Sequence, residues 1–200
     1  MPALVRRPLQ GEALRVAQLL HLSAPDMFDR FAGNHARALR TLERALGAGS
    51  TSASADCVWV AELDNEPAGA MAAFPVSEGP ARARAFLRLS LRASPPWRWP
   101  SAVRLYLIGG RAAPPPPAAA FYIDALATDE RFRRRGVARA LLAEAERQAA
   151  EQRLTAVALD TTAPNTPARR LYASAGFEEV AYTPAGRGLP GFVALVKRLS

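Results

Sequence analysis

The pattern of apolar and polar residues is most regular between residue 120 and the C-terminus. Apolar runs typical of buried strands alternate there with stretches whose apolar positions recur every three or four residues, as in helices. We predict four strands and two helices: strands at 120–128, 155–161, 177–183 and 192–199, and helices at 137–152 and between Thr166 and Gly176. Thr166 is the expected N-cap of the second helix, Pro167 its first residue, and Gly176 follows its end.

The first 76 residues carry a weaker pattern of the same kind. We predict, in chain order, a strand at 3–7, a helix at 11–22, a helix start at 23–26, a helix at 34–46, and two strands at 57–63 and 68–76. Gly47 is expected at the C-cap of the helix that ends at residue 46. Residues 47–56 are rich in Gly, Ser and Ala, which predicts a mobile linker.

Residues 77–119 interrupt this regularity with prolines and tryptophans. Two stretches inside the segment, 81–93 and 101–108, have helical periodicity, and a proline run at 114–117 is typical of a rigid connector. We interpret 77–119 as a lid-like insert within one domain that spans residues 1–200. The strand–helix–strand–helix order after residue 120 favours an α/β fold with a parallel central pair of strands.

Composition excludes several classes of protein. Half of the 200 residues are hydrophobic and 22% are charged, which is enough apolar surface for a core and too little charge for a disordered chain. No stretch reaches the roughly 18 apolar residues of a membrane span, and the first ten residues lack the apolar segment of a signal peptide. The lone Cys57 excludes an intramolecular disulfide and a cysteine-built zinc site. We therefore expect a soluble, cytoplasmic protein without a membrane partner.

The net charge of +8 comes almost entirely from arginine, because Lys197 is the only lysine among 26 basic residues. Residues 81–112 contain seven arginines and no acidic residue. A basic surface of this kind binds nucleic acid or another polyanion in many proteins. Biased codon usage explains an arginine-only composition equally well, so charge alone does not make nucleic acid the expected partner.

The most informative segment is Arg131 to Arg139, between a predicted strand and a predicted helix. Gly136 allows several backbone N–H groups to converge on one anion, and the positive end of the helix dipole strengthens the attraction. Clustered arginines are otherwise unfavourable at a helix N-terminus, because the dipole repels them. A multiply charged anion bound at the turn resolves this conflict, and the alternative is a solvated basic turn.

Two motifs resemble those of the GNAT superfamily of acyl-CoA N-acyltransferases. The first, [R/Q]-x-x-G-x-[G/A] at a strand–helix junction, is met by Arg133, Gly136 and Ala138. The second is an Asn and a Tyr around a helix that precedes Gly-Phe; its positions here are Asn165, Ala168, Leu171, Tyr172, Gly176 and Phe177. The resemblance is close over residues 120–180 and holds in outline over 1–76. It implies an α/β (α+β) fold, with a mixed, strongly twisted sheet of about seven strands and helices on both faces.

The resemblance also implies acetyl-CoA as co-substrate. The diphosphate would sit on the backbone amides of Arg134 to Arg139, and the pantetheine arm would lie in a gap between strands 120–128 and 155–161. The main chain of Leu126 and Thr128 would pair with that arm, and one N–H would stabilise the oxyanion. The residues implied in cofactor binding are Leu126, Ala127, Thr128, Arg133, Arg134, Arg135, Gly136, Val137, Ala138, Arg139, Asn165, Ala168, Arg169 and Tyr172.

Tyr172 is the implied general acid, because a phenol with a pKa near 10 can protonate a thiolate whose pKa is about 8–9. The amine must lose a proton before it attacks, and Asp124 is the candidate base since it is a carboxylate inside an apolar strand, where burial raises its pKa. Simple alternation places Asp124 on one strand face with Tyr122, Leu126 and Thr128. The alternative roles for Asp124 are a structural hydrogen bond and binding of the substrate ammonium group. Further candidates are Glu62, His21 and His35.

These observations predict an N-acetyltransferase that transfers the acetyl group to a primary amine of a small molecule or peptide by direct attack in a ternary complex. We expect no metal ion, and a monomer or homodimer. Two alternatives stay open: a CoA-binding sensor without transferase activity, and an arginine-rich module that binds nucleic acid. Residues 186–191 match GxGxxG, but Pro190 and the strand that follows do not fit a dinucleotide site.

Overall fold

The computed structural model describes residues 3–109, 113–186 and 188–199. The helices are α1 (Ala13–His21), α2 (Pro25–Ala32), α3 (His35–Gly47), α4 (Gly79–Arg92), α5 (Trp99–Gly109), α6 (Val137–Glu151) and α7 (Thr166–Ser174). The strands are β1 (Leu4–Arg6), β2 (Val58–Leu63), β3 (Glu66–Pro75), β4 (Ala120–Thr128), β5 (Ala156–Thr162), β6 (Glu178–Thr183) and β7 (Phe192–Arg198). Each predicted element is present, with its ends moved by a few residues.

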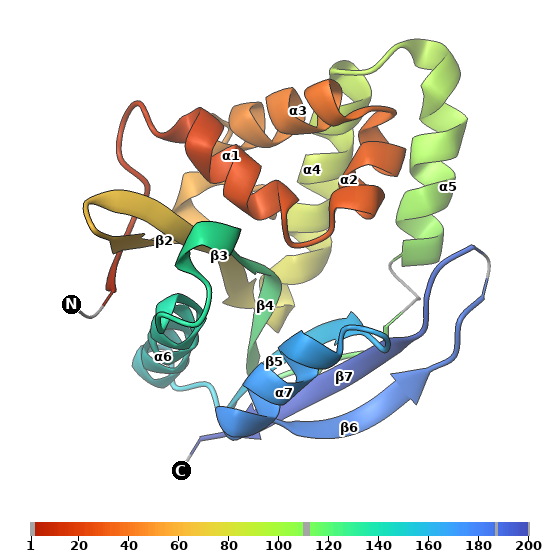
Figure 1. Cartoon of the computed structure of the whole chain (residues 1–200). Helices are drawn as coiled ribbons and strands as arrows, with labels where there is room; N and C mark the ends of the chain where they lie inside the picture. The colour runs from red at the N-terminus through yellow and green to blue at the C-terminus, as the bar shows by residue number, and fades with distance from the viewer. Residues whose placement is uncertain (1–2, 110–112, 187, 200) are drawn as a thin grey trace.

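The seven strands form one mixed sheet in the order β1-β2-β3-β4-β5-β7-β6. Its central neighbours β4 and β5 are parallel, and the other pairs are antiparallel. The predicted α/β fold with a parallel central pair is therefore confirmed. Figure 1 shows how the sheet turns between its two halves, so that β5, β6 and β7 lie apart from β2 and β3.

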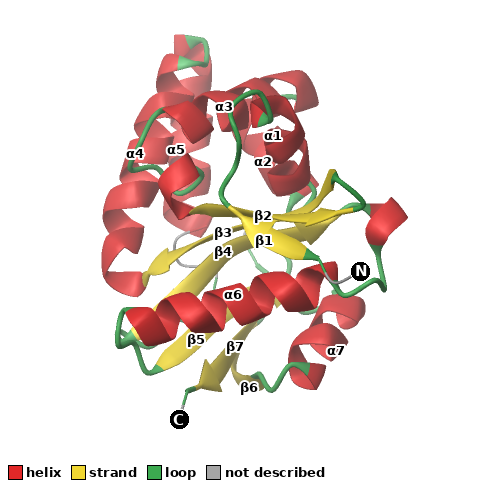
Figure 2. Ribbon diagram, turned by 90° about the vertical axis from the view of Figure 1, so that its left-hand side faces the viewer, coloured by secondary structure: helices red, strands yellow, loops and turns green. Residues whose placement is uncertain are grey.

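Helices cover both faces of the sheet, as predicted (Figure 2). On one face α6 and α7 pack over β2 to β5, and the predicted apolar face of α6 is buried there; its residues are Val137, Leu141, Leu142 and Ala145. On the other face α1 and α3 pack over β2 and β3. Phe86 and Leu89 extend this second core into α4. Two apolar cores, one on each face, hold the sheet in place.

The 77–119 segment contains α4 and α5, at the positions where helical periodicity occurs in the sequence. The helix α5 packs against α4 and α2, at the outer edge of the helical layer (Figure 1). None of the helices in the described ranges is long and apolar enough to cross a membrane.

The expectation of a mobile linker at 47–56 is wrong for the second half of that segment. Thr51 and Ser54 are fully buried. The hydroxyl of Ser54 accepts a hydrogen bond from the backbone amide of Thr51 and donates one to its carbonyl oxygen. The guanidinium group of Arg82 binds the carbonyl of Thr51 and forms an ion pair with Asp56, both across to α4. Small polar residues are common in mobile linkers, but here they form buried hydrogen bonds. Composition alone does not distinguish these two cases. Gly47 is the last residue of α3, and Ala48 occupies the C-cap.

Candidate functional site

The central parallel strands separate partway along their length. Residues 120–123 of β4 pair with residues 156–159 of β5, and the pairing stops there although β4 continues to Thr128 and β5 to Thr162. On its other edge β4 stays paired with β3 as far as Thr128. The edge of β4 that faces β5 therefore carries backbone groups without a strand partner over 124–128. The pairing thus ends between the two strands, 120–128 and 155–161, where the resemblance implied a gap.

A β-bulge lies at the start of this gap. Ala72 of β3 faces Ala125, and the next residue, Ala73, faces Ile123, so Asp124 is the extra residue of β4. The bulge reverses the alternation of faces: Tyr122 packs toward the α1–α3 core and Leu126 toward the α6–α7 core. The expectation that Tyr122, Asp124, Leu126 and Thr128 share one face is therefore wrong, because an inserted residue breaks the period of two.

Two carboxylates and a phenol meet beside the bulge. The hydroxyl of Tyr122 donates a hydrogen bond to Oδ1 of Asp160, which lies on β5. The carboxylate of Asp124 is solvent-accessible, yet protein atoms crowd it, and this partial loss of water together with the charge of Asp160 raises its pKa to about 7. Burial also raises the pKa of Asp160, while the hydrogen bond from Tyr122 opposes that change. The pKa values of both carboxyl groups are therefore raised, which favours uptake of a proton at this place.

Tyr172 lies on α7 in the same neighbourhood. Its ring is 7% exposed and packs against Phe177, with 5.9 Å between the ring centroids. Burial, followed by the charge of Asp160, raises the pKa of Tyr172 to about 12. Its phenol is therefore neutral at physiological pH and able to donate a hydrogen bond.

The structure does not bring the other candidate bases to this place. The carboxylate of Glu62 accepts two hydrogen bonds from Arg6, at 2.8 and 2.6 Å, on the β1–β2 pair. These two contacts occupy the carboxylate oxygen of Glu62, so Glu62 fits a structural role. His21 and His35 lie in the α1–α3 layer, where both face Asp29.

The turn between β4 and α6 has the geometry of an anion site. Arg134 and Gly136 adopt left-handed conformations, with φ of 61° and 85°, and a Cβ on Gly136 would meet open space. No side chain of the described chain caps α6, and Ala140 makes the first backbone bond, to the carbonyl of Gly136. Within the described residues, the amides from Arg134 to Arg139 have no hydrogen-bond partner, so they remain available as donors. These donors and the space beside them fit a diphosphate group.

Close packing fixes this turn beside the end of β4. A Cβ on Gly69 of β3 would lie 2.7 Å from Cγ1 of Val137 and 2.9 Å from the carbonyl oxygen of Ala127. Only a glycine lets the first residue of α6 approach the sheet so closely. The turn and the unpaired edge of β4 thus form one continuous surface of backbone donors. Arg133 and Arg135 extend from it into ion pairs with Glu130 and Asp64.

The residues of α7 play a local structural part. Asn165, and not Thr166, is the N-cap: its Oδ1 accepts a bond from the amide of Ala168 at 3.4 Å, and its Nδ2 donates to Thr161 at 3.2 Å. Asn is the stronger capping residue, and the Thr-Pro pair simply follows it inside the helix. Arg169 binds Glu179 and the carbonyl of Ala163. Ala168 packs against the α6–α7 core.

Sequence reasoning missed Asp160, which completes the cluster. Its signal was present, since Asp160 is a carboxylate that follows the apolar run Ala156–Leu159, as Asp124 interrupts the apolar strand 120–128.

Thr128 has a buried hydroxyl without a partner: its Oγ1 makes no hydrogen bond within the described part of the chain. It sits at the end of the unpaired β4 edge, where a ligand would be its natural partner.

Comparison with known proteins agrees with this geometry. The family model described as acetyltransferase (GNAT) family matches residues 17–177. The chain therefore belongs to the GNAT family of acetyltransferases, whose members transfer acetyl groups from acetyl-CoA.

Solved structures with the same fold are distant in sequence. An N-acetyltransferase from Staphylococcus aureus Mu50 shares 18% identity and a TM-score of 0.74, over 97% of this chain and 100% of that one. SsHAT shares 22% identity and a TM-score of 0.67, over 99% and 98% of the two chains. Ard1 from Thermoplasma volcanium shares 17% identity and a TM-score of 0.60, over 100% and 99%. No curated protein sequence matches the chain.

Proposed function

We propose that the protein transfers an acetyl group from acetyl-CoA to a primary amine by direct attack in a ternary complex at the gap between β4 and β5. The observation that carries this proposal is the cluster of Asp124, Asp160, Tyr122 and Tyr172 where the two strands separate. It combines groups able to accept and to donate a proton beside an unpaired strand edge.

Backbone groups hold the co-substrate in this proposal. The amides from Arg134 to Arg139 bind the diphosphate, and the free edge of β4 at Leu126 to Thr128 pairs with the pantetheine arm. The side chains of Arg133, Arg134 and Arg139 are exposed around the turn and add positive charge for the phosphates. An amide of the β4 edge also donates to the carbonyl oxygen as negative charge develops on it.

Asp124 accepts the proton of the amine. A pKa of about 7 leaves a large fraction of Asp124 ionised at neutral pH, and its solvent-accessible carboxylate can meet an incoming ammonium group. Asp160 strengthens this role, since two neighbouring carboxylates retain one proton more readily than one. The neutral amine then forms its bond to the acetyl carbon.

Tyr172 assists the departure of the thiolate. As the carbon–sulfur bond breaks, the phenol donates a hydrogen bond, and then its proton, to the sulfur. The thiol leaves with a proton from Tyr172, and the proton that Asp124 took from the ammonium group returns to the phenolate through solvent, which restores both side chains. Tyr122 is held by Asp160 and positions that carboxylate.

The acceptor is a primary amine of a small molecule or of a peptide, and α4 and α5 are the part of the chain that we propose as a lid over its site. A panel of polyamines, amino acids, aminoglycosides and short peptides, each incubated with acetyl-CoA, tests the function. We expect thiol release together with a mass increase of one acetyl group on at least one amine.

The same experiment separates the alternatives. A protein that binds CoA but acetylates no amine is a sensor, and that result refutes the transferase proposal. Steeply salt-dependent binding of DNA or RNA that CoA does not displace, again without acetylation, indicates a nucleic-acid module.

A further inference from the structure

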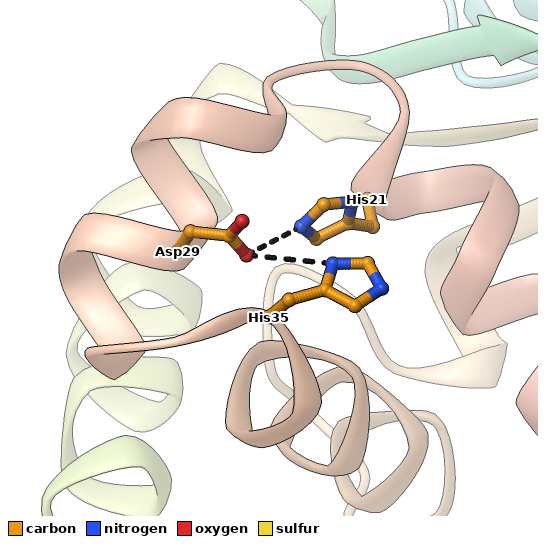
Figure 3. Close-up of side chains that lie close together, drawn as sticks. All are labelled: His21, Asp29 and His35. Carbon is orange, nitrogen blue, oxygen red and sulfur yellow. Dashed lines mark hydrogen bonds and ion pairs between the residues drawn. The ribbon is translucent and has the colours of Figure 1, made fainter.

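Three side chains from the helical layer converge at a point that the proposed reaction does not use (Figure 3). His21 ends α1, Asp29 lies on α2, and His35 begins α3. Their donor atoms all lie within 4.8 Å of one another. Five to seven residues of turn or helix separate each from the next, so only the folded packing of the three helices brings them together.

Ordinary hydrogen bonding explains only part of this arrangement. Nε2 of His21 lies 2.7 Å from Oδ1 of Asp29, which is a hydrogen bond. Nδ1 of His35 faces the same oxygen at 3.7 Å, too far for a hydrogen bond. The two imidazole rings meet edge to face, with 4.6 Å between their centroids. Two ring nitrogens thus face the same oxygen of Asp29, but only the nitrogen of His21 is hydrogen-bonded to it.

We propose that His21, Asp29 and His35 form a binding site for a divalent metal ion of the zinc type. Two imidazole nitrogens and a carboxylate are a common zinc ligand set, with metal–ligand distances of about 2.0–2.2 Å. Donors of a tetrahedral zinc site lie about 3.3 Å apart, between the 2.7 and 3.7 Å separations seen here. The three donors span up to 4.8 Å, so rotations of the side chains that draw the widest pair together would admit the ion. This proposal departs from the expectation of no metal ion: the two histidines are fourteen positions apart in the chain, and only the fold brings them together.

The proposed site borders a cavity that leaves room for a fourth ligand. A cavity of about 620 Å³ lies between α2 and α5, and Asp29 and His35 form part of its wall. Arg30, Arg98 and Arg104 line the same space. Their positive charges weaken the binding of a bare cation but attract anions, so the site favours a hydroxide, carboxylate or phosphate oxygen as fourth ligand.

A bound ion links three helices that cover one face of the sheet. Buried His21 is 4% exposed, whereas the side chain of His35 is 62% exposed and provides a route to solvent. An ion that binds the folded chain and not the unfolded one stabilises the fold in proportion to its concentration. The site thus stabilises the packing of α1, α2 and α3, and this role is independent of the acetyl transfer proposed above.

Zinc binding to the whole chain tests this proposal. The protein carries no histidine tag, and a chelator removes any bound metal before the titration. A competition titration against a chromophoric chelator should give one zinc ion per chain with a Kd below about 1 µM. His35→Ala and Asp29→Asn should each weaken binding by at least about 30-fold. Because His21 and His35 are the only histidines of the chain, loss of binding in His35→Ala reports on this site.

Asp26→Asn is the matched control, since Asp26 is an exposed acid on the same helix and lies outside the cluster. It should bind zinc like the wild type, and zinc should raise the Tm of both but not of His35→Ala. A wild-type Kd above about 10 µM, or an unchanged Kd in His35→Ala, overturns the proposal.

Discussion

Replacing Tyr172 by Phe removes the one hydroxyl that the proposed mechanism places beside the leaving sulfur. The substitution keeps the ring, and therefore the packing against Phe177 and the α6–α7 core. Since the ring is 7% exposed and only an oxygen atom is lost, we expect the Tm and the Kd for CoA to stay close to those of the wild type. A change in kcat then reports on the hydroxyl alone.

The pKa of Tyr172 sets the size of the effect. At about 12, this pKa lies well above that of a thiol. Complete proton transfer to a thiolate with a pKa near 8.5 is therefore uphill by about 5 kcal/mol. The proton therefore crosses late, and most of the rate effect comes from the hydrogen bond that precedes its transfer and strengthens as charge develops on sulfur; water can replace part of that bond. We expect kcat to fall by about 10- to 100-fold, or roughly 1.4–2.7 kcal/mol of transition-state stabilisation.

The assay is release of free thiol at saturating acetyl-CoA and amine, under conditions where chemistry limits the rate. Tyr182→Phe is the control, because Tyr182 is 61% exposed on β6 and the same atom is removed there without a role in the reaction. If Tyr172→Phe keeps kcat within about twofold of the wild type, Tyr172 only packs in the core, and the assignment of the acid is refuted.

Three further changes test other parts of the site. Gly136→Ala should weaken CoA binding at least about tenfold by placing a methyl group where the diphosphate approaches, whereas Gly11→Ala, with a similar positive φ and equally open surroundings, should leave the Kd measured by calorimetry unchanged. Asp124→Asn should abolish the rise of kcat/KM with pH around 7. Its stability relative to the wild type should also rise from about pH 4 to pH 7: the raised pKa of Asp124 makes the folded wild type bind more protons than the unfolded chain, so wild-type stability falls across that window. Cys57→Ala should keep the kcat of the wild type, since burial raises the pKa of Cys57 to about 11 and direct attack needs no acetylated thiol; a large loss of activity would instead indicate an acetyl-cysteine intermediate.

Local sequence carries most of the fold and of the cofactor site. The apolar strand 120–128, the glycine turn at Gly136 and the amphipathic helix α6 follow one another along the chain, so spacing alone identifies them. The two helices within 77–119 are equally visible, because the periodicity of α4 and α5 survives between the prolines. These features depend on residues close together in sequence.

Features that depend on pairing between distant segments were not predictable. The bulge at Asp124 arises from the register with β3, and it alone decides which way Tyr122 and Leu126 point. The partnership of Tyr122 with Asp160 requires the β4–β5 pairing. Burial of Ser54 depends on contact with α4, and composition alone predicts an exposed linker.

Initial rates of acetyl transfer, measured over a matrix of acetyl-CoA and amine concentrations, test the proposed direct attack. An amine found by the acceptor panel is used, and the acetylated product is quantified by mass spectrometry. If the amine attacks acetyl-CoA while both are bound in the gap between β4 and β5, double-reciprocal plots intersect, and Asp124→Asn lowers the rate without changing that pattern. Parallel lines, with an acetyl group found on the protein before the amine is added, contradict direct attack.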